Sequence, residues 1–314
     1  PAPAIKFTLP PVEVALYPPR NANCPPMPDD PPPTNIDTSP PWLPAEMPEL
    51  PEVENLCRYL IADGVPGLSV ISVDVAAART IRTPSVEDFV LGLSGRRVVE
   101  IGRRAKYIDV ALDHGHLILH MGMTGSLRVS APDDEALRFA HTVFHLDDGR
   151  RIELNDPRKW ASVWLVDRFE DALPELGPEP LDMSFTAEEF VRRVSGRRSP
   201  IKAVLLDQAV IAGVGNIYAD EALLRAGISP SRRAHRISGQ RLSRLLEEIR
   251  TSLRRAINYI GDNPMDDGRP FVVDAFDDRM QILRKPGSVC PQCGGVLKTK
   301  VIGGRTAYFC GSCQ

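Results

Sequence analysis

Cys290-Pro-Gln-Cys293 and Cys310-Gly-Ser-Cys313 are two Cys-X-X-Cys pairs with 16 residues between them. Four thiolates on two tight turns can meet at one tetrahedral Zn²⁺, and this spacing is typical of a zinc ribbon. The alternative is a pair of disulfides, but the remaining cysteines, Cys24 and Cys57, complete no disulfide framework and nothing indicates export. Because four cysteines leave no coordination position open, we expect one structural Zn²⁺.

The charge changes sign towards this cysteine motif. Residues 1–190 carry 17 Lys and Arg against 30 Asp and Glu, whereas residues 191–314 carry 21 against 11. A C-terminal third this basic indicates either a polyanionic partner or a solvated charged surface, and composition does not separate the two. There is no run of about 20 apolar residues and no secretory signal, so we expect a cytoplasmic protein rather than a membrane protein.

Helical patterns fill most of this basic third. Thr186-Ala-Glu-Glu189 matches a capping box, and Ser199-Pro200 is a good opening for a helix. Asn216 is a candidate N-cap, and Gly227 a candidate stop. The helices expected after the capping box cover 201–207, 216–224 and 242–260.

A glycine-rich turn, Gly213-Val-Gly-Asn216, joins two of these helices. Backbone amides at a helix start, together with the helix dipole, favour an anion such as phosphate. The side chain of Asn216 can donate a hydrogen bond, and Lys202 is close in sequence. An ordinary glycine turn is the alternative reading, but the basic charge and the zinc ribbon favour DNA binding.

The sequence before residue 167 has a different periodicity. Apolar residues over 50–61 recur at helical spacing, and Gly64 supplies a stop. Residues 68–166 are predicted to be strands, with hairpins over 107–120 and 141–154. We therefore expect a β-sandwich or barrel beside one helix, followed by a helical domain and the zinc ribbon.

Residues 1–46 hold 15 of the 30 prolines. Such a segment has too few apolar residues to offset the entropy of ordering, so we expect it to be extended or disordered. It is a candidate linker, a candidate ligand for proline-binding modules, or a tail without a part in the chemistry.

Seven blocks of the sequence resemble, in order, the bacterial formamidopyrimidine-DNA glycosylase/endonuclease VIII family. They cover 47–54 (Met-Pro-Glu-Leu-Pro-Glu-Val-Glu), 103–107, 120–126, 155–160, 176–181, 213–218 and 304–310. The resemblance implies an α+β multidomain fold with a β-sandwich domain at 47–178, a helix–two-turn–helix domain at 183–275 and a zinc finger at 276–314. It also implies a bifunctional glycosylase and AP lyase of base-excision repair, with double-stranded DNA bound in the cleft between domains.

The same resemblance makes Pro48 the nucleophile, because an N-terminal proline amine can form a Schiff base with the sugar C1′ before β,δ-elimination. Glu49 would be the general acid and base, and Lys106 and Arg305 would complete the catalytic set. Without the resemblance, Pro-Glu would simply mark a helix start. Since an internal proline nitrogen is an amide, we expect residues 1–46 and Met47 to be absent from the active protein.

The remaining DNA contacts are also implied by the resemblance. His120, Asn216 and Arg305 match phosphate-binding positions, whereas Met123, Arg158 and Trp160 match residues that fill the gap left by a flipped nucleotide. A structural histidine, and methionine and tryptophan in a core, are the alternatives. Nothing indicates an oligomer, so we expect a monomer.

Substrate preference follows from smaller differences. Leu50 favours the formamidopyrimidine branch, whereas Phe139 and the segments 261–268 and 284–287 depart from the usual family pattern. We expect oxidised purines, namely formamidopyrimidines and 8-oxoguanine, and abasic sites to be the substrates. The alternatives are an endonuclease VIII-like enzyme for oxidised pyrimidines and, if Pro48 stays blocked, a non-catalytic protein that binds damaged DNA.

Overall fold

The computed structural model describes residues 47–265, 268–270, 280, 282–285 and 287–314. The proline-rich segment 1–46 and the expected boundary at 275–276 lie outside the described residues. Within the described part of the chain, no helix is both long and apolar enough to cross a membrane.

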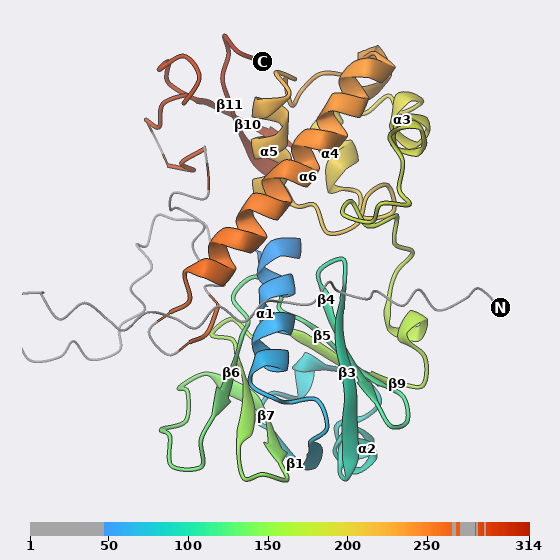
Figure 1. Cartoon of the computed structure of the whole chain (residues 1–314), viewed down its shortest axis with the longest axis vertical. Coiled ribbons are helices and arrows are strands. Elements are labelled where there is room, and N and C mark those ends of the chain that lie inside the picture. Colours follow the sequence, from blue (N-terminus) through green and yellow to red (C-terminus); the bar gives the residue numbers. More distant parts are fainter. Residues whose placement is uncertain (1–46, 266–267, 271–279, 281, 286) are drawn as a thin grey trace, which may run out of the picture. The chain divides into compact units, whose positions relative to one another are not determined.

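A mixed sheet dominates the first part of the chain (Figure 1). In the described residues nine strands follow the order β2-β9-β5-β4-β3-β1-β7-β8-β6. Only Ser69 and Val70 of β1 pair with β3, so the sheet is divided at this point into two halves. The strands are β1 (Ser69–Val75), β2 (Ile81–Thr83), β3 (Arg96–Arg104), β4 (Tyr107–Leu112), β5 (His116–His120), β6 (Ser126–Ser130), β7 (Ala140–Leu146), β8 (Arg151–Asn155) and β9 (Ser162–Val166).

The two halves enclose one apolar core. Val73 and Phe144 from one half join Ile108 and Leu119 from the other in a single buried cluster, which also includes Leu56 of α1 (Leu50–Ala62). The predicted sandwich, both hairpins and the flanking helix are therefore confirmed. Burial of apolar side chains from both halves of the sheet is the main stabilising contribution to this arrangement.

One helix was not predicted in this part. Residues Val86–Leu93 form α2 within a range expected to contain only strands. Its N-cap, Ser85, accepts a hydrogen bond from the amide of Asp88, and Phe89 and Leu93 are buried at helical spacing.

The second part is helical, as predicted. Thr186 caps α3 as expected, and the long basic helix is longer than expected. The helices are α3 (Ala187–Ser195), α4 (Ile201–Leu206), α5 (Asn216–Arg225) and α6 (Gly239–Asp262).

Two predicted caps were wrong. Pro200, not Ser199, is the N-cap of α4, because the first amides of this helix donate to the carbonyls of Arg232 and Pro230 instead. Likewise Gly215, not Asn216, is the N-cap of α5, and Asn216 is the first helical residue. In both cases a distant segment satisfies amides that a local side chain was expected to satisfy.

The C-terminal residues form a small two-stranded unit. Strands β10 (Lys298–Ile302) and β11 (Arg305–Phe309) pair in antiparallel register around Gly303-Gly304, and both glycines have positive φ. Tyr308 and Leu297 pack on Leu224 of α5 in a separate apolar cluster. The zinc-ribbon architecture predicted from the cysteine spacing is confirmed.

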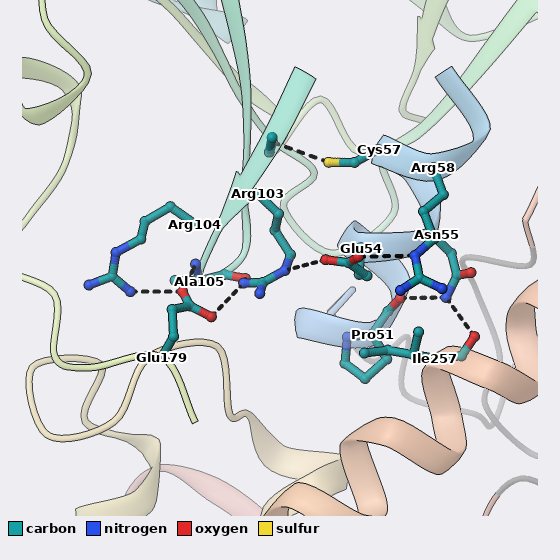
Figure 2. Close-up of polar contacts among 11 residues, drawn as sticks. Pro51, Glu54, Asn55, Cys57, Arg58, Arg103, Arg104, Ala105, Glu179 and Ile257 are labelled. Carbon is teal, nitrogen blue, oxygen red and sulfur yellow. Dashed lines mark hydrogen bonds and ion pairs between the residues drawn. The ribbon is translucent and has the colours of Figure 1, made fainter. Parts of the chain in front are cut away.

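Helix α1 connects the two larger parts (Figure 1). Its first residue, Leu50, is buried in the core of the helical part, whereas Leu56 lies in the core of the sheet. The Nδ2 of Asn55 donates to the carbonyl of Ile257 on α6 at 3.1 Å, as Figure 2 shows.

Ion pairs reinforce this junction. Arg103 at the end of β3 lies between Glu54 of α1, at 3.0 Å, and Glu179, at 2.8 Å (Figure 2). Burial alone opposes the charged form of Glu179. Even so, Arg103, the amide of Ala105 and Arg104 lower the pKa of this carboxyl below its ordinary value. Glu179 is therefore ionised at neutral pH, and it fixes the turn that follows β3.

Candidate active site

A cavity of about 600 Å³ is lined by residues from all three parts of the fold. The sheet part contributes Lys106, His120 and Met123, the helical part contributes Asn216, and the finger contributes Arg305. Met47 and Glu49, just before the start of α1, also line this cavity. Residues far apart in the sequence are thus brought to one site.

Glu49 occupies the N-terminus of α5. Its carboxylate accepts hydrogen bonds from the amides of Gly215 and Ile217, both at 2.8 Å, and a longer one from Tyr218 at 3.4 Å. The glycine turn was expected to bind phosphate through these amides, and that expectation was wrong because Glu49 already satisfies them. The anion site predicted from the helix start exists, but a side chain of the same chain fills it.

The backbone of Glu49 is held as well. Its amide donates to Glu52 at 2.9 Å, which completes a capping box, and Glu52 in turn accepts the Tyr218 hydroxyl at 2.6 Å. Pro48, the residue before, is buried, whereas Met47 is partly exposed and lines the cavity. The entrance to α1 therefore has a fixed backbone directly beside the cavity.

Lys106 lies in a tight turn between β3 and β4, within the range 68–166 that was expected to form strands. Ala105 before it has φ of 54°, and its amide donates to Glu179 at 2.6 Å. The turn directs Lys106 towards the start of α5, because a Cβ added to Gly215 would lie less than 3.0 Å from both Lys106 Nζ and the Glu49 carboxylate. Glycine at 215 permits this close approach, since a Cβ there would displace both groups.

His120 ends β5 and faces the cavity. Its Nδ1 accepts a hydrogen bond from the amide of Gly122 at 3.1 Å, and its ring lies 4.8 Å from that of Tyr107. Burial, together with Lys106 and Arg82, lowers the pKa of His120 to about 4. The ring is therefore neutral at neutral pH, and with Nδ1 accepting, its Nε2 carries the proton as a hydrogen-bond donor.

Met123, Arg158 and Trp160 lie on two loops that one carboxylate joins. The side chain of Asp156 accepts hydrogen bonds from the Thr124 hydroxyl and from the amides of Arg158, Trp160 and Ala161. Asp156 is 1% exposed, whereas Trp160 is 49% exposed and its ring lies 5.4 Å from the Arg158 guanidinium. Of the three residues, only Met123 lines the cavity. Because about half of its side chain is exposed, Trp160 is not a core residue.

Arg305 is exposed at the tip of the β10–β11 hairpin and lines the same cavity as Glu49. Among the residues that the structure describes, no ion pair to Arg305 is recorded. The guanidinium is thus available to a phosphate, which it can bind in a bidentate manner.

Lys202 differs from the expectation of a phosphate contact. Its ammonium group is fully buried, lies 2.7 Å from the Asp220 carboxylate and donates to the carbonyl of Thr306 at 3.1 Å. A buried and paired ammonium does not reach DNA, so this prediction was wrong in its proposed role. Lys202 instead links α4 and α5 to the hairpin that carries Arg305.

The four cysteines fit one Zn²⁺. Their sulfur atoms all lie within 4.8 Å of one another, and two of the separations are 3.9 Å and 3.5 Å. Tetrahedral Zn–S bonds of about 2.3 Å require sulfur atoms about 3.8 Å apart, whereas a disulfide requires about 2.05 Å. The zinc is structural, and it joins the two turns that frame the hairpin.

Three features of the site were not predicted from the sequence. They are the role of Asp156 between the two loops, the Glu52–Tyr218 pair behind Glu49, and the amide of Gln208, which holds the turn before α5 through the carbonyl of Val214 at 2.8 Å. Asp156 carried a usable signal, because Asn-Asp-Pro favours an Asx-type turn. The Glu52–Tyr218 pair joins segments 166 residues apart, whereas the Gln208 contact is local and has no recognisable sequence pattern.

Family models agree with this three-part architecture. The formamidopyrimidine-DNA glycosylase N-terminal domain matches residues 47–163, and the formamidopyrimidine-DNA glycosylase H2TH domain matches residues 176–264. The zinc finger found in FPG and IleRS matches residues 287–314. Sheet, helical part and finger thus form the three-part fold of a DNA-repair glycosylase.

Individual relatives extend over the same region. Formamidopyrimidine-DNA glycosylase of Pelotomaculum thermopropionicum is 38% identical over 275 residues, which cover 85% of this chain and 99% of the relative. That of Stenotrophomonas maltophilia is 40% identical, with 85% and 100% covered. This chain belongs to the formamidopyrimidine-DNA glycosylase family.

Solved structures support the same assignment. The MutM (Fpg) protein of Thermus thermophilus is 35% identical with a TM-score of 0.74, covering 85% of this chain and 98% of that one. A Lactococcus lactis Fpg mutant in complex with DNA that contains Fapy-dG is 29% identical with a TM-score of 0.76, covering 85% and 99%.

Proposed function

We propose that this chain is a bifunctional DNA glycosylase and AP lyase that removes oxidised purines from double-stranded DNA. The observation that carries the proposal is the shared cavity. Met47, which precedes Pro48, lines it together with Glu49, Lys106, His120, Asn216 and Arg305. Relatives with formamidopyrimidine-DNA glycosylase names, and solved relatives bound to abasic-site and Fapy-dG DNA, support the substrate class.

The first step proposed is attack of the Pro48 ring nitrogen on C1′ of a flipped nucleotide. The C1′–N bond breaks and the base leaves with a proton, while opening of the sugar ring breaks C1′–O4′ and yields an iminium. Glu49, whose carboxylate is held beside Pro48 by the α5 amides, accepts the proton that the ring nitrogen loses and transfers it to O4′, while the departing base takes its proton from water.

The second step proposed is strand cleavage from that iminium. Loss of a C2′ proton expels the 3′ phosphate, and loss of a C4′ proton then expels the 5′ phosphate. Lys106 lies beside Glu49, and His120 and Arg305 bind the phosphates that flank the flipped nucleotide. A neutral imidazole and an arginine fit this role, because both donate hydrogen bonds to anions.

The gap left by the flipped nucleotide is filled, in this proposal, by the two loops that Asp156 joins. Met123 enters beside the cavity, Trp160 offers an exposed face for stacking, and Arg158 faces the orphaned base.

All of this requires a free amine at Pro48. Bound to Met47, the ring nitrogen is an amide and has no nucleophilic lone pair. We therefore propose that the active form begins at Pro48. The family models begin to match at residue 47, and relatives matched over 99% or more of their length cover only 85% of this chain, which supports that start.

Borohydride trapping tests this proposal. Two forms, one beginning at Pro48 and one beginning at Pro1, are incubated with a duplex that contains 8-oxoguanine and then reduced. A covalent protein–DNA adduct is expected from the Pro48 form alone. Absence of an adduct from that form, or equal adducts from both, contradicts the Schiff-base mechanism.

The same assay on a thymine glycol duplex separates the enzymatic alternative. A preference for thymine glycol would favour an endonuclease VIII-like enzyme, and tight binding without any adduct would favour a non-catalytic protein that binds damaged DNA. The monomeric state and the cytoplasmic location stay predictions from the sequence.

A further inference from the structure

A buried carboxylate in α5 holds two cations. The Oδ1 of Asp220 lies 2.7 Å from the Nζ of Lys202 on α4, and its Oδ2 lies 2.6 Å from the Nη1 of Arg284. The three side chains are at most 2% exposed. A buried ion pair adds little net stability over apolar residues of the same volume, and in some proteins it instead fixes one arrangement of the segments that it joins.

Both cations also donate to one backbone carbonyl, that of Thr306 in β11. The Nζ of Lys202 lies 3.1 Å from it, and the Nη2 of Arg284 lies 2.9 Å from it. Asp220 itself accepts the amide of Tyr308 at 2.9 Å. Two alternate residues of the strand are thereby fixed to α4 and α5.

Further contacts hold the same strand. The guanidinium of Arg284 lies 4.8 Å from the centre of the Tyr308 ring. At the hairpin turn, a Cβ added to Gly303 would lie 3.2 Å from the Cβ of Ala203, so the turn packs against α4. Arg305 stands between the turn and Thr306, and it lines the cavity.

We propose that Asp220 and Arg284 are positioning residues that hold Arg305 where it binds a DNA phosphate. They act through the backbone of Thr306 and Tyr308 and do not touch DNA, because both are buried. This inference rests on the proposed function, in which Arg305 is a phosphate contact.

A double-mutant cycle tests it. Zinc-loaded protein beginning at Pro48 is prepared as the parent, Asp220→Asn, Arg305→Ala and the double variant, and the Kd is measured for a duplex with a tetrahydrofuran abasic-site analogue. Asp220→Asn is expected to raise Kd about tenfold in the parent and less than about twofold in Arg305→Ala. Equal effects in both backgrounds overturn the proposal.

A second variant guards against misfolding. Arg284→Lys keeps the charge but loses the second nitrogen and the planar face, through which Arg284 contacts the Asp220 carboxylate, the Thr306 carbonyl and the Tyr308 ring at once. Like Asp220→Asn, Arg284→Lys is expected to raise Kd in the parent and to change it much less in the Arg305→Ala background. Zinc content and the thermal unfolding temperature are measured for every variant. The double-mutant cycle is evaluated for the substitution, Asp220→Asn or Arg284→Lys, whose zinc content and unfolding temperature match those of the parent.

The matched control is another buried carboxylate with two cations. Glu153, in the sheet, is fully buried and lies 2.7 Å from Arg128 and 2.9 Å from Arg151. Any effect of Glu153→Gln is expected to be the same with and without Arg305. Coupling as large for Glu153 as for Asp220 would overturn specific positioning. If Arg305→Ala itself leaves Kd unchanged while trapping persists, the phosphate contact fails but the glycosylase assignment does not.

Discussion

The carboxylate of Glu49 accepts a hydrogen bond at 2.8 Å from the backbone amide of Ile217, a residue 168 positions further along the chain. A helix N-terminus carries a partial positive charge, which favours the ionised form of a carboxylate placed there. The contact therefore fixes the direction of a group beside the proposed nucleophile. It also ties the entrance of α1 to the start of α5.

Gly215→Ala tests how closely this contact is built. The added Cβ would lie less than 3.0 Å from the Glu49 carboxylate and from Lys106 Nζ, so both must move. We expect kcat for release of 8-oxoguanine to fall about 100-fold, because displacements of about 1 Å have effects of this size. Gly196→Ala is the control, since a Cβ there meets nothing within 4 Å. If kcat of Gly215→Ala stays within about twofold of the parent, the prediction is contradicted.

The stability of the protein should depend on His120 at acidic pH. Its pKa is lowered to about 4 in the folded chain, whereas an unfolded chain has a histidine pKa of about 6.5. Between these values only the unfolded chain takes up the proton, so the stabilisation is complete above about pH 6.5 and is lost as the pH falls towards 4.

Denaturant unfolding of the parent and His120→Gln at about pH 7.5 and about pH 5 measures this effect. On lowering the pH, the parent should lose about 2 kcal/mol more unfolding free energy than the variant. Equal losses in the two proteins would show that the histidine is not kept neutral by its surroundings.

Asp156→Asn should loosen the two loops proposed to fill the DNA gap. The substitution turns an acceptor oxygen into a donor that faces backbone amides, and we expect unfolding free energy to fall by about 2 kcal/mol. The preference for a lesion duplex over an undamaged duplex should fall too. Asp148→Asn is the control, because that carboxylate also accepts a backbone amide in a tight turn. Unchanged preference in Asp156→Asn would argue against the role of the loops.

Cys290→Ser should remove the zinc and weaken DNA binding by at least about tenfold, because structural zinc supplies folding free energy to the finger that carries Arg305. Metal analysis and the Kd for an abasic-analogue duplex measure the two effects. Cys57→Ser is the matched control. Its buried thiol donates to the carbonyl of Gly102 and lies in α1, outside the cysteine cluster, so full zinc content is expected. Zinc loss without weaker binding would contradict the link to Arg305.

Local patterns predicted much of the fold. The hairpins, the cap at Thr186 and the cysteine cluster all depend on residues close in sequence, and each is confirmed. The family resemblance carried the assignment to formamidopyrimidine-DNA glycosylases, which charge and spacing alone did not reach. The roles of Pro48 and the DNA contacts stay predictions.

What failed depended on partners far along the chain. A glycine turn before a helix predicts an open anion site, but in the fold the Glu49 carboxylate accepts hydrogen bonds from its amides. From the sequence, Lys202 is expected to be a surface cation. In the fold it is buried and paired with Asp220, and nothing in the sequence marks Asp220 among the many acidic residues as its partner. Arg284 stands in a segment that departs from the family pattern, and only the fold shows that it meets the same carboxylate.

Because Leu50 is buried in the helical core and Glu49 completes the start of α5, the first turn of α1 is structurally part of the half that begins after residue 176. Chimeras between relatives that exchange the two halves at the connecting segment would separate these partners. Crossovers that transfer residues 48–55 together with the helical half should give soluble hybrids more often than cuts made at the connection alone.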